Sequence, residues 1–540
     1  MRASPPAGEG HRCLFPQSHS LFAIVNASPS ADTATPSQSR TGLATTWAWL
    51  RSPPGRAWAA VLLACVASRL ATRITYIEDP DSLRFALSVA DEYDIAALQP
   101  HFPGYPVFWA AAELFAGPTG SFSVAFALVG GLSTAGLLWA LLRLWGVPLR
   151  SVEGAVLTGL VVFNPLIWLM GTRYMPDLMG TAGALATLAA LFAALRAWSS
   201  TDAQTQTTAQ DRTAVHWAVA GMAGAGLLAG LRLSYLPMVF LPVLVVLWRV
   251  GRRGTQILAG TVGVLVWLIP MIVDTGFWTL VDVAWGQTTG HFTEFGGTVQ
   301  TAPDLSRRVL GMGQGLWADG LGGWSPGRHP LTGAVGLGVL SLGGLGGWRL
   351  WRADALRNPR VWLLAAAALL YAAWIFFFQN VIHKSRHVLP LLPVLLLVLA
   401  AGGATLWRAR WAGRRALLLG FVGAYAAVTL VLVTQHMNPS AIAQTKSYVE
   451  RQVQTQDSVR VASVPLINDY LRAQQVEARY LSIEDSSDVR RLRTVDTGTT
   501  LVVGTYTSLL DREPTRTKTF YHNPHVNRMW PEVTVYVYDH

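Results

Sequence analysis

The chain has 540 residues, of which 51% are hydrophobic and only 14% are charged, and its formal net charge at pH 7 is +11. A water-soluble protein of average composition carries about 25% charged residues, so most of this chain is not built to face water. This composition excludes a disordered chain, a collagen and a nucleic-acid-binding globule, and nucleic acid is not an expected partner.

The first 50 residues differ in character from the rest of the chain. Residues 1–50 are rich in Ser, Pro, Ala and Thr without apolar periodicity, so they cannot bury enough surface to offset the loss of chain entropy. We predict a disordered cytoplasmic leader. Of the two cysteines, Cys13 lies in this leader and Cys65 in an apolar run, so neither a disulfide framework nor a thiolate metal site is available.

A membrane domain is predicted over 51–436. Its apolar stretches approach the roughly 20 residues that a helix needs to cross about 30 Å of hydrocarbon. We predict about eleven spans, at 57–75, 122–144, 152–171, 177–197, 214–232, 235–249, 255–273, 330–348, 361–380, 387–406 and 416–435. The stretch 102–117 opens with Pro103, Gly104 and Pro106, and we expect it to be a juxtamembrane helix on the outer face.

Arginine clusters set the expected orientation, because positively charged loops stay in the cytoplasm. The clusters are Arg143 with Arg150, then Arg249, Arg252 and Arg253, then Arg349, Arg352, Arg357 and Arg360, then Arg408, Arg410, Arg414 and Arg415. The N-terminus is then inside, and the loops 76–121 and 274–329 and the C-terminus are outside. We expect a multi-pass protein of the inner (plasma) membrane. Its excess of arginine is explained by the cytoplasmic loops, which orient the spans.

The tail, 437–540, is expected to be a small extracytoplasmic α/β domain. Three runs, 459–464, 501–503 and 533–538, are rich in β-branched and aromatic residues. The last run alternates strictly, as a half-buried strand does. Polar stretches of helical character lie between these runs.

Three acids, Glu78, Asp79 and Asp81, follow the first span within four positions. Such acidic residues can have no role beyond keeping a loop exposed to water. Here, however, Asp81 heads a helical pattern that leads into a Pro-Gly-rich turn at 99–106. This arrangement would hold a carboxylate at the membrane surface, within reach of a lipid-borne substrate.

With these residues the chain resembles the GT-C superfamily of integral-membrane glycosyltransferases, which includes protein O-mannosyltransferases and lipid A aminoarabinose transferases. In that family an outer-loop acid heads an Asp-Glu-x-Arg-Tyr-Ala pattern, and a His- or Lys-Pro-Pro motif follows. Asp81 and Arg84 fit the first pattern, and the run from His101 through Tyr105 resembles the second, with Phe in place of its first Pro. The second acid is missing, which leaves open whether Asp79 replaces it and whether a divalent cation is bound.

Two later motifs extend the resemblance over most of the membrane region. Asn164-Pro165, followed by the run from Tyr174 to Asp177, looks like the turn between two spans in these enzymes. The segment 383–393 is similar to their Arg-Tyr-x-Leu-Pro-x-x-Pro element.

Lys384 is one of three lysines in the chain and lies beside Arg386 between two apolar spans. Cations at a span end commonly snorkel to lipid headgroups, but Arg and Lys together also suit a phosphate. The candidate substrate-binding residues are Arg84, His101, Tyr105, Arg173, Asp177, Arg232, His383, Lys384, Arg386 and His387.

The loop 274–329 offers a second set of candidates. Aromatic and acidic side chains such as Trp285, Asp319 and Trp324 could line a sugar site, or the tryptophans could anchor the loop at the interface. His291 with Glu294 at a spacing of three is a weak metal pair, because a third ligand is missing. No metal site is predicted.

The resemblance implies an inverting transfer of a sugar from a polyprenyl-phosphate donor to an acceptor hydroxyl on the outer face. Asp81 would be the general base, Asp79 is the second catalytic candidate, and no cofactor is required. The sequence does not identify the sugar or the acceptor, which could be a protein, a lipid or a glycan. A transporter or lipid-linked-sugar flippase is the alternative, although such proteins place ionisable groups near the midplane and often show internal repeats. A non-catalytic assembly protein of the envelope is a third hypothesis.

Overall fold

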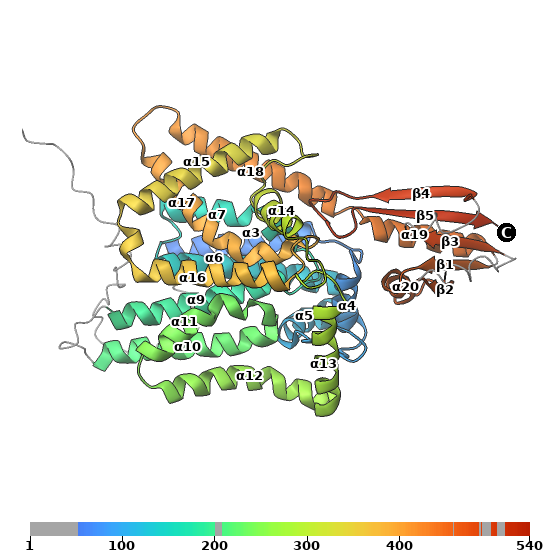
Figure 1. Ribbon diagram of the computed structural model, residues 1–540. Helices are drawn as coiled ribbons and strands as arrows, with labels where there is room; N and C mark the ends of the chain where they lie inside the picture. The colour runs from blue at the N-terminus through green and yellow to red at the C-terminus, as the bar shows by residue number, and fades with distance from the viewer. Residues whose placement is uncertain are drawn as a thin grey trace, which may run out of the picture.

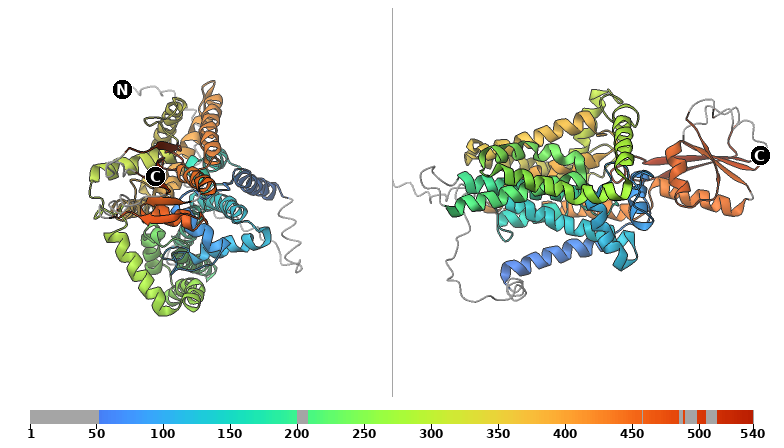
Figure 2. Two further views of the ribbon diagram at one scale, coloured as in Figure 1. Left: turned by 90° about the vertical axis from the view of Figure 1, so that its right-hand side faces the viewer. Right: turned by 90° about the horizontal axis from the view of Figure 1, so that it is seen from below.

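The computed structural model describes residues 52–199, 208–456, 458–484, 488, 498–504 and 513–539. A body of long helices carries a small sheet domain at one end (Figure 1). The views in Figure 2 show the same arrangement end-on and from below. The predicted fold class, a polytopic helical membrane protein with a C-terminal α/β domain, is confirmed. The predicted leader lies outside the described residues.

The predicted spans correspond to helices, and the outer loops also contain helices. The helices of the body are α3 (Pro53–Ala71), α4 (Pro80–Ala90), α5 (Pro106–Thr119), α6 (Phe122–Trp145), α7 (Val152–Val162), α8 (Pro165–Met170), α9 (Asp177–Ser199), α10 (Thr208–Arg232), η1 (Leu233–Tyr235), α11 (Leu236–Arg249), α12 (Arg253–Thr275), α13 (Phe277–Thr293), α14 (Leu305–Gln314), η2 (Gly315–Gly320), α15 (Leu331–Arg352), η3 (Ala355–Arg357), α16 (Pro359–Phe378), η4 (Ser385–Leu391), α17 (Leu392–Arg408) and α18 (Arg414–His436).

Eight stretches of the described chain are long and apolar enough to cross a membrane. One of them, Gln210–Arg249, contains two predicted spans, which the short helix η1 separates into α10 and α11. The predicted turn near Arg232 is therefore present. The predicted juxtamembrane helix is α5, whose 14 residues extend only about 21 Å and are too short to cross.

The span predicted at 152–171 is not one continuous helix. Pro165 cannot continue a helix, because it lacks a backbone N–H and clashes with the preceding turn. Asn164 Oδ1 therefore caps α8, accepting from the backbone N of Ile167 at 3.0 Å. Arg69 from α3 donates to the carbonyl oxygen of Val162 at 3.3 Å. The break is buried inside the protein, where such irregular backbone is tolerated at membrane depth.

The segment 274–329 is largely helical, whereas the sequence predicted a loop. It contains α13, α14 and the π-helix η2. In Figure 1, α13 lies across the end of the bundle that carries the sheet domain. Trp278 and Trp285 of α13 are exposed, which is typical of a helix lying in a membrane interface.

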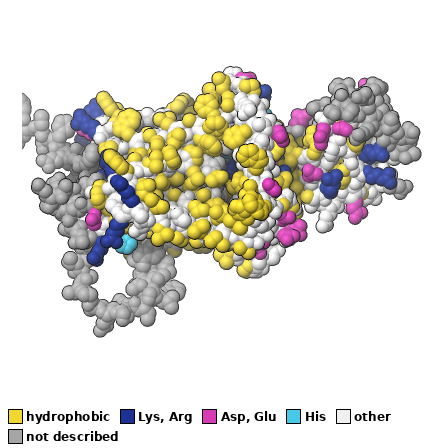
Figure 3. Space-filling model, turned by 60° about the horizontal axis from the view of Figure 1, so that its bottom comes forward, with side chains coloured by type: hydrophobic (Ala, Val, Ile, Leu, Met, Phe, Trp, Pro, Cys, Tyr) yellow, Lys and Arg dark blue, Asp and Glu magenta, His cyan; other side chains and the backbone are white. Residues whose placement is uncertain are grey.

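The two ends of the body differ in charge, and Figure 3 shows an apolar belt between them. The predicted arginine clusters lie in the turns that follow α6, α11, α15 and α17 and in the helix ends beside those turns. These turns are at the end opposite the sheet domain (Figure 1). We call this end the arginine end, and the opposite one, with α4, α5 and the sheet domain, the sheet end. Acidic side chains are more frequent toward the sheet end (Figure 3).

The C-terminal domain contains one five-stranded sheet in the order β2-β1-β3-β5-β4. Its elements are α19 (Ala441–Thr455), β1 (Val459–Ser463), α20 (Pro465–Arg472), β2 (Arg479–Ser482), β3 (Thr499–Val503), β4 (Arg516–Tyr521) and β5 (Glu532–Asp539). β1 pairs in parallel with β2 and β3, and β5 pairs antiparallel with β3 and β4. The three predicted strands are confirmed. The two missed strands, β2 and β4, are at the edges, where exposed polar residues hide the apolar pattern.

Candidate functional site

The candidate site begins at the N-terminus of α4. Asp79 is the N-cap, and its Oδ1 accepts from the backbone N of Ser82 at 2.7 Å. Pro80 follows at the first helical position, where its missing N–H costs nothing. Asp81 is thereby fixed in the first turn, where the helix dipole favours a negative charge. Burial, then the neighbouring Asp81 and Glu78 carboxylates, raise the pKa of Asp79.

Asp81 is bound by two cations from the segment between α16 and α17. Its Oδ2 lies 2.6 Å from Lys384 Nζ and 2.6 Å from Arg386 Nη2. The side chains of Asp81, Lys384 and Arg386 are 15%, 20% and 10% exposed, so the cluster is only just accessible. Burial alone would raise the pKa of Asp81, but Lys384 and Arg386 hold it well below its ordinary value. Asp81 is therefore ionised and a weak base while both cations bind it.

A second carboxylate and cation lie beside this cluster. Arg232 Nη2 lies 2.9 Å from Asp177 Oδ1, and its Nη1 donates to the hydroxyl of Tyr105 at 3.1 Å. The Tyr105 hydroxyl also lies 3.1 Å from Nε2 of His101. Tyr235 donates to Asp177 Oδ1 at 3.2 Å. A chain of polar side chains thus connects α9, α10 and the turn before α5.

Arg386 connects the two carboxylates. Its Nε lies 4.0 Å from Asp177 Oδ1. Several buried polar atoms of this cluster have no hydrogen-bond partner among the described residues, namely Arg386 Nε, Arg232 Nε, Asp177 Oδ2, His101 Nδ1 and His387 Nδ1. A buried polar atom without a partner costs about 1–3 kcal/mol, and a ligand that hydrogen-bonds to these atoms would remove that cost. The cluster is therefore suited to a polar ligand.

The turn before α5 places Tyr105 in an unusual backbone conformation. Tyr105 has φ of 48°, in the left-handed region, and follows Gly104 with φ of 80°. An aromatic residue in this region costs about 1–3 kcal/mol and is found mostly where the structure holds it for a purpose. The ring of Phe85 on α4 packs edge-on against both His101 and Tyr105. Burial lowers the pKa of His101 to about 3, so this imidazole is neutral at pH 7.

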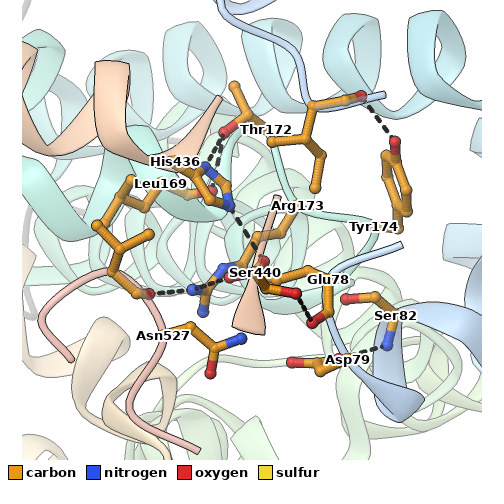
Figure 4. Close-up of polar contacts among 12 residues, drawn as sticks. Glu78, Asp79, Ser82, Leu169, Thr172, Arg173, Tyr174, His436, Ser440 and Asn527 are labelled. Atoms are coloured by element: carbon orange, nitrogen blue, oxygen red, sulfur yellow. Dashed lines mark hydrogen bonds and ion pairs between the residues drawn. The ribbon is translucent and has the colours of Figure 1, made fainter. Parts of the chain in front are cut away.

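Glu78 has structural contacts that the sequence did not predict (Figure 4). Its Oε1 lies 2.6 Å from Arg173 Nη2, and its Oε2 lies 3.1 Å from Nε2 of His436. Arg173 also donates to the backbone carbonyl of Val526 in the C-terminal domain. Burial alone would raise the pKa of Glu78, but Arg173 and His436 lower it to about 2. Arg173, a substrate-binding candidate from the sequence, thus connects the segment before α4 to the C-terminal domain, and Glu78 connects that segment to α18.

The remaining predicted substrate-binding residues have fewer polar side-chain contacts with the cluster around Asp81. Arg84 is half-buried and makes no hydrogen bond or ion pair with the residues that the structure describes. His383 is exposed. His387 is buried, and its carbonyl oxygen accepts from the Tyr371 hydroxyl at 2.8 Å. The structure thus brings together Asp81, Asp177, Lys384, Arg386 and Arg232 with Tyr105 and His101, and not Arg84 or His383.

The loop between β4 and β5 docks the C-terminal domain onto the body. His525 Nδ1 lies 2.8 Å from Asp319 Oδ1, and Arg528 contacts the other carboxylate oxygen. The Oγ of Ser325 lies 3.3 Å from His525 Nε2. Asp319 is 2% exposed. This residue, a sugar-site candidate from sequence, is therefore a docking residue in the structure.

Replacing Asp319 by asparagine should loosen this docking. The variant keeps the shape of the side chain but removes the charge that Arg528 and His525 contact, at a cost of about 1–3 kcal/mol. Hydrogen exchange in residues 522–531 should accelerate relative to the helices of the body. Asp469→Asn, which removes the carboxylate of an exposed pair with Arg472, is the control and should leave exchange in that loop unchanged.

The other candidate residues of the segment 274–329 are not part of the contacts around Asp319. His291 contacts the carbonyl oxygen of Phe378 at 2.8 Å, and Trp285 and Trp324 are exposed. Within the described part of the chain, no group of three or more His, Cys, Asp or Glu side chains is arranged to hold a metal ion.

No protein-family model and no curated protein matches the sequence. Among solved structures, the chain is similar to ArnT from Cupriavidus metallidurans bound to undecaprenyl phosphate, with 14% identity, 91% of this chain and 98% of that chain covered, and a TM-score of 0.47. It is also similar to the archaeal oligosaccharyltransferase AglB from Archaeoglobus fulgidus in complex with an inhibitory peptide and a dolichol-phosphate, with 10% identity, 86% and 70% covered, and a TM-score of 0.44. Likenesses of this size do not determine an activity, which has to be inferred from the residues of the site.

Proposed function

We propose that the chain is a GT-C-type membrane glycosyltransferase that transfers a sugar from a polyprenyl-phosphate donor to an acceptor hydroxyl. The observation that carries the proposal is the pair of 2.6 Å contacts from Lys384 and Arg386 to one oxygen of Asp81. The order of the sequence motifs that contain these three residues supports the same reaction. The proposed activity is that of a hexosyl- or pentosyltransferase.

Lys384 and Arg386 form a site suited to the donor phosphate. The Arg guanidinium can fork onto two phosphate oxygens, and the Lys ammonium supplies a compact charge. In the structure, Asp81 binds to both cations. A phosphate entering from the membrane would compete with Asp81 for them, and the cations would then stabilise the charge that develops on the departing phosphate.

Competition with the phosphate would make Asp81 a better base. Burial and the two cations act in opposite directions on the pKa of Asp81. When the cations turn to the phosphate, burial remains, so this pKa rises and the carboxylate accepts a proton more readily. General base catalysis of this kind contributes about 10²- to 10⁴-fold to a rate.

The donor, the acceptor and Asp81 account for every bond, electron pair and proton in the proposed reaction. The acceptor oxygen bonds to the anomeric carbon while the bond from that carbon to the phosphate oxygen breaks. The electron pair leaves with the phosphate, and the acceptor proton passes to Asp81. Attack from the face opposite the phosphate inverts the anomeric carbon. The hydroxyl of Tyr105 and the neutral imidazole of His101 are placed to orient sugar hydroxyls.

The charge distribution supports an orientation with the site outside the cell. The arginine end, which the positive-inside rule places in the cytoplasm, is opposite the site. The N-terminus is then cytoplasmic and the C-terminal domain extracytoplasmic. The proposed location is the inner (plasma) membrane.

Binding of undecaprenyl phosphate to the purified protein tests the phosphate site. Lys384→Ala and Arg386→Ala should each weaken binding at least about tenfold, because each removes a charge-assisted contact. Lys446→Ala, which breaks an i,i+4 pair with Glu450 on α19, is the control and should bind like the unaltered protein. Equal binding by all variants would refute the phosphate site. Labelled polyprenyl-phosphate sugars incubated with the same preparations then identify the donor.

A further inference from the structure

A large cavity lies in the body, away from the site around Asp81. Its volume is about 1630 Å³, and it is bounded mainly by α6, α9 and α10. Pockets for small ligands usually measure about 300–1,000 Å³, so this one can accept a larger molecule. None of the residues grouped around Asp81 lines it.

The walls of the cavity are apolar along the bundle axis. The lining positions on α9 extend from Gly183 to Ala197, which is about 21 Å of helix. Small residues such as Ala186, Ala220 and Gly224 shape the surface of α9 and α10 along this length. One leaflet of the membrane core is about 15 Å deep. The cavity is therefore long enough, and apolar enough, to hold an extended hydrocarbon chain.

The cavity is strongly basic where it reaches the arginine end. Five arginines line it, Arg143, Arg150, Arg196, Arg349 and Arg360. Glu153 is the one acid among the described lining residues, and it is already bound by Arg349 at 3.1 Å and by the indole of Trp145 at 2.7 Å. The lining is therefore complementary to an anion.

Four of these arginines lie in the first or last turn of a helix: Arg143 on α6, Arg196 on α9, Arg349 on α15 and Arg360 on α16. Arg196, in the last turn of α9, donates to the carbonyl oxygens of Leu144 and Arg143 at 3.3 and 3.2 Å. The charges of Arg143 and Arg360 act directly on Arg196. Arg143 and Arg150 are exposed, so they are positioned to meet a headgroup at the mouth.

We propose that this cavity binds an anionic phospholipid of the leaflet at the arginine end. The phosphate contacts Arg143 and Arg150 at the mouth, and an acyl chain lies along α9 and α10. Basic pockets between membrane helices on the cytoplasmic side bind anionic headgroups such as that of cardiolipin. The apolar walls argue against free phosphate as the ligand. Trp139 and Trp217, which also line the cavity, suit the headgroup boundary.

Native mass spectrometry of the full-length protein tests the proposal. The protein is taken up in vesicles of phosphatidylcholine with a minor share of phosphatidylglycerol, extracted with a non-ionic detergent, and its retained lipid is counted. The unaltered protein should retain phosphatidylglycerol in preference to phosphatidylcholine. Arg143→Gln with Arg150→Gln should retain at least about tenfold less phosphatidylglycerol, because charge-assisted contacts are lost.

Two further variants separate the cavity from general surface charge. Arg408→Gln with Arg410→Gln removes two exposed arginines at the same end that do not line the cavity, and should retain phosphatidylglycerol fully. Ala220→Trp fills the cavity from an exposed position without changing a charge, and should lose the lipid. Ala220→Trp also tests the proposal on its own if the variant with Arg143→Gln and Arg150→Gln fails to fold.

Several outcomes would overturn the proposal. These are equal retention of the two phospholipids, undiminished retention in the arginine variant or in Ala220→Trp, and an equal loss in the Arg408 and Arg410 control. Two added probes distinguish other anions. Inorganic phosphate that displaces the lipid would indicate a free-phosphate site, and undecaprenyl phosphate retained in preference to phosphatidylglycerol would indicate a donor site.

Discussion

Replacing Asp81 by asparagine should lower the rate of sugar transfer by about 10²- to 10⁴-fold, the usual contribution of a general base. Binding of undecaprenyl phosphate should be retained or strengthened, because Asp81 no longer competes for Lys384 and Arg386. A loss of transfer without a loss of lipid binding would assign Asp81 to the chemical step. The measurement pairs a transfer assay with a binding assay on the same preparation.

Asp79→Asn is the matched control for this prediction. It makes the same chemical change two positions earlier, and asparagine caps a helix about as well as aspartate, so α4 should keep its position. We expect transfer to stay within a few-fold of the unaltered rate. If Asp79→Asn abolished transfer while Asp81→Asn retained it, the base would be Asp79, and the proposed competition with the phosphate would be wrong.

Replacing Glu78 by alanine should produce the largest loss of stability. Glu78 is fully buried, and its removal leaves Arg173 and His436 without the carboxylate that contacts both. Breaking a buried ion pair in this way costs about 3–5 kcal/mol. A thermal unfolding scan in detergent should show the loss. Glu450→Ala, which breaks the partly exposed pair with Lys446, should cost less than about 1 kcal/mol.

The stabilising effect of Glu78 should also depend on pH. Its pKa in the folded protein is about 2, lowered from 4.5. A depressed pKa contributes stability above the unfolded value, and this contribution is lost as the pH falls through the folded value. The difference in stability between the unaltered protein and Glu78→Ala should therefore shrink between about pH 4.5 and pH 2. A difference that stays constant over this range would contradict the ion-pair contribution.

The C-terminal domain contributes to the position of the catalytic candidate. Leu83 of α4 belongs to the same buried apolar cluster as Ile442 and Tyr470 of that domain. The Tyr470 hydroxyl donates to the carbonyl oxygen of Ile77 at 2.5 Å, and the Ser440 hydroxyl donates to that of Glu78 at 2.8 Å. The segment that leads into α4 is thus held by the C-terminal domain, which explains in physical terms why the sheet domain and the site share one end.

The locations of the charged residues are relevant to the alternative hypothesis of a transporter or flippase. A transporter concentrates ionisable residues near the midplane, whereas Asp81, Asp177, Arg232, Lys384 and Arg386 gather at helix termini of the sheet end. This placement favours chemistry at a membrane surface.

The sequence by itself determined the membrane class, the helical stretches and three of the five strands. These features depend on local composition and periodicity, which are visible in one segment at a time. It also marked Asp81, Lys384 and Arg386 as candidates, because charged residues at the ends of long apolar runs are conspicuous. The edge strands β2 and β4 and the helices within 274–329 lack such a local signal and were missed.

Only the tertiary structure decided which charges meet. Arg173 and Arg386 have the same chemistry and both lie at span ends, yet Arg173 pairs with Glu78 and Arg386 with Asp81. The partners of Arg386 and Lys384 are about three hundred residues away in sequence, and helix packing sets their separation. The break at Asn164 and the docking residue Asp319 were likewise decided by neighbours from distant segments, since a buried polar group acquires its role from the partners that packing brings to it.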